Sequence, residues 1–456
     1  MIDPLDAVSP LDGRYAELTA PLRPYVSEGS FTRARTRVEV EYIIHLASTE
    51  TIPLSLDSDE IESLRDIYQN WSGKDAGRIK QIEVDGTEEQ PATNHDVKAI
   101  EYFLQEHTEE RIHPWIHFGL TSEDVNNVAR RILLKGACSE ILIPQLQSIR
   151  ETLVEYAHEY ANVSMLSRTH GQAATPTTVG KEFAVFASRI GQAVSTIDIA
   201  LEELVGKLSG ATGTYAAHQV TYPDVDWRTF ARDFVARLGL NYVEPVTQIN
   251  PGDDLATLFD AIARINRILI DCARDCWRYI SDGYFVQQSV KTETGSSTMP
   301  HKINPIDFEN AEGNLSKANA DLNFLSNYLA ESRLQRDLSD STVKRSIGST
   351  LGHCLIAYTK IDQGLSKIQP DEERIEKDLN DHPEILTEAY QMILRKEGEV
   401  EAYEQIKSMT RGEELDLEDL HDEIRNLNVS EEVKQRLLSL KPTSYTGVAR
   451  ELAEEA

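Results

Sequence analysis

Apolar residues recur every three or four positions through most of the chain, which is the spacing of one face of an α-helix. The clearest run follows Asp253 and contains Leu255, Leu258, Phe259, Ile262, Ile265, Ile268, Leu269 and Cys272. It predicts a helix from residue 253 to about residue 287. Similar runs predict helices from Asp96 onward, from Thr121 to about Tyr160 with a kink near Pro144, from Thr178 to Leu208, over 307–331 and over 341–366. Period-2 alternation is scarce, so we expect an all-α fold without a large sheet.

The predicted helices in the middle of the chain are about 30 residues long, and helices of that length are rods of roughly 45 Å. Rods of this kind form a long bundle. Pro370, followed by the charged run DEERIEKD, marks one domain boundary, and the segment His117–Leu120 marks an earlier one. We therefore expect three helical domains: an N-terminal domain over 1–118, a central long-helix bundle over 119–369 and an acidic C-terminal domain over 370–456.

The charge balance narrows the range of partners. The chain has 46 Lys and Arg against 76 Asp and Glu, a formal net charge of −30. Nucleic acids and anionic membranes need a cationic face, so neither is an expected partner. The first ten residues lack the features of a signal peptide, no 18 apolar residues run together, and the four cysteines show no CxxC spacing. A cytoplasmic location is the expectation.

The most unusual local sequence is KTETGSSTMPHKINPI at 291–306, which lies between two predicted helices. Its glycine, serines and prolines forbid a continuous helix, and a plain turn between helices would be shorter, so a functional loop is predicted. The Walker spacing GxxxxGK[ST] is absent from this segment and from the glycine-containing stretch 210–215, which argues against a phosphate loop.

Four other stretches carry polar side chains at helix ends or between helices, and each also has a structural interpretation. SRTHGQAATP at 167–176 holds a histidine that could be structural. Thr93–Asp96 and Thr121–Ser122 are predicted helix starts, where Thr93, Asn94 or the hydroxyls of Thr121 and Ser122 could be simple caps or could bind an anion. Thr121 and Asp124, three residues apart, resemble a capping box. Arginines gather over 333–345, either as an exposed helix face or as a site for carboxylate or phosphate. His113 and His117 flank Pro114 without a third ligand, so no metal site is predicted.

Taken together, these stretches resemble a known family. GSSTMPHKINP at 295–305 resembles the signature loop of the fumarase/aspartase superfamily, and SRTHGQAATP is similar to its second conserved region. Within that superfamily, four further stretches resemble the bacterial type of the adenylosuccinate lyase family. They are SPLDGRY at 9–15, TNHDVKAIE at 93–101, TSEDVNN at 121–127 and IDFEN at 306–310. The resemblance covers essentially the whole chain. VDGTEEQPA at 84–92 is longer than the family pattern.

The resemblance implies an all-α homotetramer of three-domain chains, with the central helices of four chains in one shared core and each active site drawn from several subunits. The implied reaction is β-elimination of fumarate from adenylosuccinate, giving AMP, and from SAICAR, giving AICAR. The small-molecule substrates are the implied partners, and no metal or organic cofactor is implied.

The resemblance also assigns roles to residues by motif. Ser296 is the implied general base that removes the Cβ proton, and His170 the general acid that protonates the leaving nitrogen. The implied substrate contacts are Arg14, Tyr15, Asn94, His95, Asp96, Thr121, Ser122, Thr169, Gln248, Lys302, Asn304, Arg336, Ser341 and Arg345. These residue types suit the chemistry, because a carbanion beside a carboxylate becomes a dianion that fixed cations and N–H donors must stabilise.

Alternative functions exist both inside and outside the superfamily. A carboxymuconate cycloisomerase has a similar loop but handles no phosphate, so the TNHD segment, Arg14 and the arginines of 333–345 argue against it. The same residues argue against an argininosuccinate lyase and a fumarase. An inactive structural protein on the same scaffold would have no need to keep both Ser296 and His170.

Overall fold

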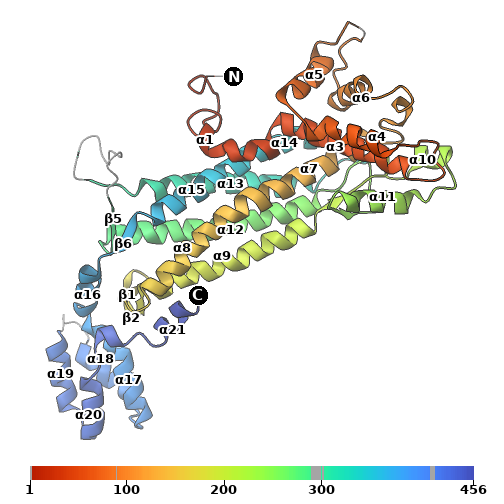
Figure 1. Ribbon diagram of the computed structural model, residues 1–456. Coiled ribbons are helices and arrows are strands. Elements are labelled where there is room, and N and C mark those ends of the chain that lie inside the picture. Colours follow the sequence, from red (N-terminus) through yellow and green to blue (C-terminus); the bar gives the residue numbers. More distant parts are fainter. Residues whose placement is uncertain (1–2, 89, 289–298, 300–301, 411–415) are drawn as a thin grey trace. The chain divides into compact units, whose positions relative to one another are not determined.

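Figure 1 shows the computed structural model, which describes residues 3–88, 90–288, 299, 302–410 and 416–456. The chain divides into two compact units. Unit 1 consists of Met1–Gln145, Ala193–Arg267 and Asn314–Ala357, and unit 2 of Leu146–Gln192, Ile268–Gly313 and Tyr358–Ala456. Every boundary between them falls inside a helix. The expected division into 1–118, 119–369 and 370–456 stays a prediction.

Long helices form the middle of the chain, as the periodicity predicted (Figure 1). They are α7 (Ser122–Ala137), α8 (Ile143–Glu159), α9 (Val179–Glu202), α12 (Asp253–Ser281), α13 (Ile306–Leu329) and α15 (Ile347–Leu365). Between α7 and α8, residues Cys138–Leu142 form a π-helical turn. It lies just before Pro144, which has no N–H to donate and whose ring crowds the preceding turn, so the irregular turn has an identifiable cause close to the predicted kink.

The remaining helices of unit 1 are shorter, except for α3, which has 20 residues. They are α1 (Ala16–Thr19), α2 (Arg23–Val26), α3 (Glu28–Ala47), α4 (Ser58–Gln69), α5 (Gly73–Val84), α6 (Asp96–Glu106), α10 (Ala216–Thr221), α11 (Trp227–Arg237) and α14 (Ser339–Lys344). Two short strands, β3 (Val205–Gly206) and β4 (Asn241–Tyr242), pair in parallel. Single 3-10 turns occupy Ala20–Leu22 and His113–Trp115.

Unit 2 contains two antiparallel strand pairs and the C-terminal helices. Strand β1 (Ser164–Thr169) pairs with β2 (Gln172–Thr178), and β5 (Phe285–Gln287) pairs with β6 (Ile368–Pro370). The helices are α16 (Glu372–Asn380), α17 (Thr387–Lys396), α18 (Ala402–Thr410), α19 (Leu417–Asn426), α20 (Glu431–Leu438) and α21 (Ala449–Glu454), with 3-10 turns at Pro383–Leu386 and Pro442–Ser444. Helices α17 to α20 enclose a core that includes Tyr390, Leu394, Leu420, Ile424 and Leu437.

The apolar face of α12 is buried, as its spacing predicted: Leu255, Leu258, Phe259, Ile265 and Leu269 are all fully enclosed. A polar contact crosses this interior within unit 1. The amide of Asn266 donates to Asn319 Oδ1 on α13 at 3.0 Å and lies 3.4 Å from Cys354 Sγ on α15. A buried amide that finds partners on two neighbouring helices helps to fix how they pack, because leaving it unpaired would be costly.

The structure corrects several predicted boundaries. The predicted helix over 341–366 is two helices, because the chain turns at Ser346, whose Oγ and N–H both donate to the Val343 carbonyl. The helix predicted to reach residue 287 ends at Ser281. Gly283, with φ +75°, closes it, and the Tyr284 N–H reaches back to the Tyr279 carbonyl. The helix predicted over 178–208 spans Val179–Glu202.

About 65% of the chain is helix and 5% is strand, so the all-α prediction is confirmed. Each sheet in the described residues has two strands. None of the described helices is long and apolar enough to cross a membrane.

A buried ion pair stabilises the start of α7. Lys207 Nζ lies 2.7 Å from Asp124 Oδ1, and both side chains are fully enclosed. Three backbone N–H groups also donate to the Asp124 carboxylate: Thr121 at 2.8 Å, Ser209 at 2.9 Å and Gly210 at 3.1 Å. The Thr121 bond is one half of the capping box predicted from the sequence, which is confirmed.

We expect Lys207→Met to lower the free energy of unfolding by about 3–5 kcal/mol, because it leaves the Asp124 carboxylate buried without its counter-charge. Lys317→Met is a matched control, since Lys317 pairs with Asp321 on the exposed surface of α13, and it should cost less than about 1 kcal/mol. Urea or thermal unfolding of the three proteins measures the difference. Equal effects of the two substitutions would contradict the importance of the buried pair.

Candidate active site

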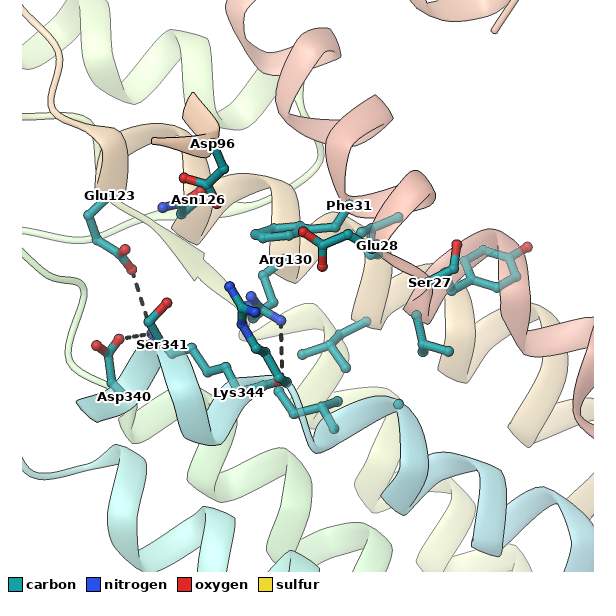
Figure 2. A pocket seen from close by; sticks show the side chains of 17 residues that line it. Ser27, Glu28, Phe31, Asp96, Glu123, Asn126, Arg130, Asp340, Ser341 and Lys344 are labelled. Carbon is teal, nitrogen blue, oxygen red and sulfur yellow. Dashed lines mark hydrogen bonds and ion pairs between the residues drawn. The ribbon is translucent and has the colours of Figure 1, made fainter. Parts of the chain in front are cut away.

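A cavity of about 100 Å³ lies in unit 1 where α2, α3, α7 and α14 meet (Figure 2). Its lining residues are Tyr25, Val26, Ser27, Glu28, Phe31, Asp96, Glu123, Asn126, Arg130, Leu133, Leu134, Asp340, Ser341, Lys344, Arg345, Ile347 and Gly348. Three of them, Asp96, Ser341 and Arg345, are among the site residues predicted from the sequence. Segments far apart in the sequence therefore meet at one polar cavity.

Helix α7 supplies one wall of this cavity. Glu123, Asn126 and Arg130 recur at the spacing that places side chains on one helical face. Glu123 is 3% exposed, and its carboxylate lies 3.5 Å from Lys344 Nζ and 3.5 Å from the guanidinium of Arg336. Desolvation lowers the pKa of Arg130 to about 10, against partial opposition from Glu123, so Arg130 keeps its charge at neutral pH.

Phe31 lines another side of the cavity, and two cations are stacked on its ring. The guanidinium carbons of Arg35 and Arg130 lie 4.1 and 4.3 Å from the centroid of the Phe31 ring. Arg35 also donates to Asp96 Oδ2 at 2.6 Å. Burial on its own raises the pKa of Asp96, but the charge and hydrogen bond of Arg35 outweigh it, so the net pKa lies below its usual value. Asp96 is therefore a carboxylate at neutral pH.

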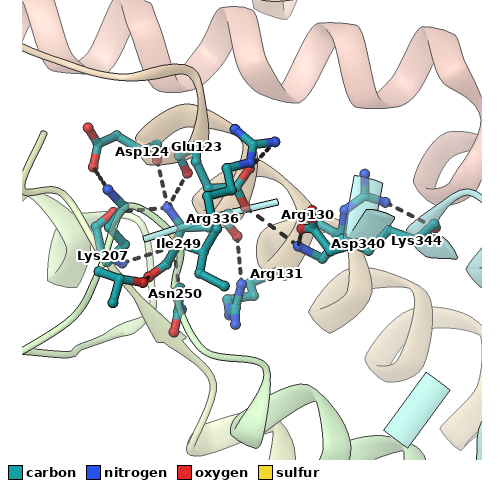
Figure 3. Close-up of polar contacts among 12 residues, drawn as sticks. Glu123, Asp124, Arg130, Arg131, Lys207, Ile249, Asn250, Arg336, Asp340 and Lys344 are labelled. Carbon is teal, nitrogen blue, oxygen red and sulfur yellow. Dashed lines mark hydrogen bonds and ion pairs between the residues drawn. The ribbon is translucent and has the colours of Figure 1, made fainter. Parts of the chain in front are cut away.

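Polar atoms at the cavity are left without partners. Within the part of the chain that the structure describes, the buried Oδ1 atoms of Asn126 and Asp340 and the Nε of Arg336 make no hydrogen bond. Asp340 uses its other oxygen to bind Lys344 (Figure 3). Buried polar atoms are normally satisfied, so unpaired ones beside a cavity favour a polar ligand there.

A second cavity, of about 360 Å³, shares Val26, Ser27, Arg345 and Gly348 with the first. It is also lined by Ser9, Leu11 and Asp12, which belong to the SPLDGRY segment. The structure thus brings the segment that contains Arg14 and Tyr15 beside Arg345. Tyr15 itself precedes the first residue of α1.

The starts of α6 and α7 face each other. His95 caps α6 by accepting from the Lys98 N–H through Nδ1 at 3.2 Å, so the cap is His95 and not the predicted Thr93 or Asn94. Asn94 instead adopts φ +50°. His95 Nε2 lies 3.5 Å from Ser122 Oγ. Because Nδ1 accepts a hydrogen bond, Nε2 carries the proton of a neutral ring and is a donor for a ligand.

A partly buried turn holds the chain ahead of Thr121. His117, with φ +57°, binds Glu39 on α3 through its Nδ1 at 2.6 Å and its backbone N–H at 3.2 Å. Tyr42 donates to the Phe118 carbonyl at 2.8 Å. Burial alone lowers the pKa of His117, but the charge and hydrogen bond of Glu39 raise the net pKa above its usual value.

The other predicted residues lie elsewhere. In unit 1, Gln248 donates to the Ala211 carbonyl at 3.0 Å, in the loop ahead of α12. In unit 2, Thr169 ends β1 and His170 begins the turn to β2. The Gln287 amide donates to the Ile303 carbonyl at 3.2 Å, between Lys302 and Asn304. Ser296, the predicted base, lies outside the described residues.

Comparison with known proteins decides the family. A model described as "Lyase" matches residues 14–319, and one described as "Adenylosuccinate lyase C-terminal" matches residues 332–446. A Legionella pneumophila protein named adenylosuccinate lyase is 43% identical over an alignment 457 residues long, which covers 99% of this chain and 98% of the relative. The Escherichia coli K12 protein of that name is 42% identical over 458 residues, with the same coverage. The Dictyostelium discoideum one is 45% identical over 459 residues, 97% of each chain. The chain belongs to the adenylosuccinate lyase family.

Solved structures confirm the fold expected for an adenylosuccinate lyase. The fumarate lyase from Mesorhizobium sp. BNC1 superposes with a TM-score of 0.75 at 19% identity, over 96% of this chain and 97% of that one. The 3-carboxy-cis,cis-muconate lactonizing enzyme from Pseudomonas putida gives 0.73 at 19% identity, over 96% of each chain. At such identities the likeness concerns the fold alone.

Several residues that line the cavity of this adenylosuccinate lyase were not predicted from the sequence. Glu123, Asn126 and Arg130 follow Ser122 along one face of α7, so helical spacing from the TSEDVNN motif could have found them. Lys344 lies inside the 333–345 cluster, between the predicted Ser341 and Arg345. Glu28 and Phe31 offered no such signal, because they reach the cavity through contacts between distant segments. Among the described residues, no group of three or more His, Cys, Asp or Glu side chains is arranged to hold a metal ion.

The Glu39–His117 pair predicts a pH-dependent contribution to stability. A histidine pKa raised by folding stabilises the folded state fully below its unfolded value of about 6.5, and this contribution is lost as the pH rises through the folded value. His117→Gln should therefore lower Tm more at pH 6 than at pH 9. Glu39→Gln should remove the same pH-dependent part. Identical losses at both pH values, measured by thermal unfolding, would contradict the pairing.

Proposed function

We propose that this chain catalyses the elimination of fumarate from adenylosuccinate and from SAICAR, giving AMP and AICAR. The observation that carries the proposal is the match, at 42–45% identity over 97–99% of the chain, to relatives named adenylosuccinate lyase. The motif positions expected to contact substrate are present, and the cavity of unit 1 gathers Asp96, Ser341 and Arg345.

The cavity suits the phosphate end of such a substrate. Arg130, Lys344 and Arg345 line it, and Arg336 adjoins it through Glu123. Arginine offers a planar pair of donors that matches phosphate oxygens, and Ser341 adds a hydroxyl from α14. The unpaired Nε of Arg336, beside the cavity, is a hydrogen-bond donor that supports binding of an anion there. We assign the ribose phosphate to this place, with Arg14 and Tyr15 as further contacts.

The chemical step requires an acid, a base and a place for two carboxylates. In the proposed mechanism Ser296 removes the Cβ proton, and Lys302 with Asn304 hold the succinyl carboxylates as negative charge develops. His170 then protonates the nitrogen of the leaving group, a task that suits imidazole near neutral pH. His95 and Ser122, at the facing starts of α6 and α7, and Asn94, Thr121, Thr169 and Gln248 complete the proposed contacts. The mechanism calls for no metal or organic cofactor.

We further propose a homotetramer in which subunits share the active sites. Large apolar side chains are exposed on the long helices of the single chain: Val185 and Ile199 on α9, Trp277 on α12 and Phe324 on α13. Exposed apolar residues on helices of a bundle favour association with further helices. The cytoplasmic location also remains a prediction.

Ser296→Ala and His170→Gln should each reduce kcat by at least about 100-fold with much smaller changes in KM, because each removes one proton transfer. Fumarate release, followed by absorbance with adenylosuccinate and with SAICAR, measures both constants. His107→Gln, which alters a histidine at the end of α6, serves as the control and should leave kcat near wild type. Near-normal turnover by either active-site variant would refute its assigned role.

Arg345→Leu should raise KM for both substrates by roughly 10- to 100-fold, because both carry the ribose phosphate and a charge-assisted contact is worth about 1.5–3 kcal/mol. Arg333→Leu is the control from the same arginine cluster, since its side chain is 80% exposed and pairs with Asp337. It should leave KM unchanged. If the two variants behave alike, the phosphate does not bind at the Arg345 cavity.

A further inference from the structure

The general acid proposed above lies on a short hairpin in unit 2. Arg168 pairs with Ala173 and Thr169 with Gln172, so His170 and Gly171 alone make the turn. Both have positive φ, +53° for His170 and +77° for Gly171. A two-residue turn with two positive φ values matches the twist of the strands it joins, so the direction of His170 depends on where the two strands are held.

Helix α16 of the C-terminal segment packs on this hairpin. Leu379 is fully buried, and it packs against Leu166 of β1, Ala173 of β2 and Ile385 of the 3-10 turn that follows α16. Apolar burial holds the helix on the strands, but it is non-directional and does not by itself fix the position of the last residues before the turn. A directional contact is needed for that.

Asp378, next to Leu379, supplies the directional contact. Its Oδ2 accepts a hydrogen bond from the Arg168 guanidinium at 2.8 Å and a second from the Tyr284 hydroxyl. Arg168 is two residues ahead of His170, on the strand that enters the turn. The charged pair is partly enclosed, with the Asp378 side chain 16% exposed, so it is stronger than a fully exposed ion pair.

Tyr284, the second hydrogen-bond partner of Asp378, is itself held in place. Tyr284 is 2% exposed, and its carbonyl accepts from the Asp371 N–H at 2.8 Å, at the point where β5 and β6 lead into α16. The chain Tyr284–Asp378–Arg168 therefore connects a buried anchor to the strand that carries His170. On β2, Thr175 donates to the exposed Glu388, which also accepts from Tyr445 at 3.1 Å, a weaker second attachment.

We propose that Asp378 is a positioning residue for catalysis: it holds Arg168, and through the hairpin it sets the place of the His170 imidazole. This inference rests on the proposed role of His170. It gives the C-terminal segment a task in the reaction beyond enclosing its own core, because a misplacement of about 1 Å in a proton donor can cost on the order of 100-fold in rate.

The test compares Asp378→Asn with Asp381→Asn, which changes an exposed aspartate at the end of the same helix. Asp378→Asn should lower kcat by about 10- to 100-fold and change KM less than about twofold, at a temperature well below its Tm. Asp381→Asn should match wild type. If Asp378→Asn does not fold, Tyr284→Phe, which keeps the ring and loses the hydroxyl, should give a smaller loss of kcat with the same unchanged KM.

A double variant separates positioning from general stabilisation. If Asp378 acts through His170, adding Asp378→Asn to His170→Gln should lower the residual kcat no further. If it lowers that kcat by the same factor as in the wild-type background, the inference is wrong. Wild-type kcat in Asp378→Asn would also overturn it while leaving the proposed function intact, whereas failure of the wild-type protein to cleave adenylosuccinate would instead refute the function.

Discussion

The carboxylate of Asp124 is the constraint on which the arrangement of unit 1 depends. It is fully buried, and a buried charge is tolerated only when it is paired and its oxygens are satisfied. Lys207 supplies the counter-charge (Figure 3). The N–H groups of Thr121, Ser209 and Gly210 satisfy the carboxylate oxygens. The start of α7 is thereby tied to the chain that follows β3. With its first turn fixed, α7 presents Ser122, Glu123 and Arg130 in defined directions.

In the proposed assignment, a chain of net charge −30 holds the phosphate at a cavity where cations and carboxylates are paired. The cations in and beside the cavity are held by carboxylates and by an aromatic ring. Lys344 is held by Glu123 and Asp340, Arg35, beside the cavity, by Asp96, and the guanidinium groups of Arg35 and Arg130 by Phe31. Fixing long side chains in advance lowers the entropy that a ligand must overcome on binding. The net charge of the whole protein acts at long range and is screened, whereas these contacts act within a few ångströms.

In unit 2, a carboxylate and apolar packing likewise hold the segment that carries a proposed catalytic residue. The turn of His170 and Gly171 offers an exposed imidazole, and its supporting strands are short. Packing of Leu379 and Ile385 stabilises the hairpin, and the hydrogen bond from Arg168 to the Asp378 carboxylate fixes the position of its first strand. In both units a carboxylate that accepts several hydrogen bonds joins segments that are distant in the sequence.

The sequence by itself determined the helical fold, most long helices, the capping box at Thr121 and the motif positions of the site, because periodicity and caps are local properties of a few successive turns. It did not determine the hairpin of β1 and β2, whose Pro176 and short strands give no alternating pattern, or the break at Ser346. Nor did it place Glu28, Phe31, Arg130 and Lys344 at one cavity, or Asp378 beside Arg168. Those arrangements depend on pairings between residues more than two hundred positions apart, such as Glu123 with Lys344. Only the packed tertiary structure decides them, because each contact forms only when many others have already brought its partners together.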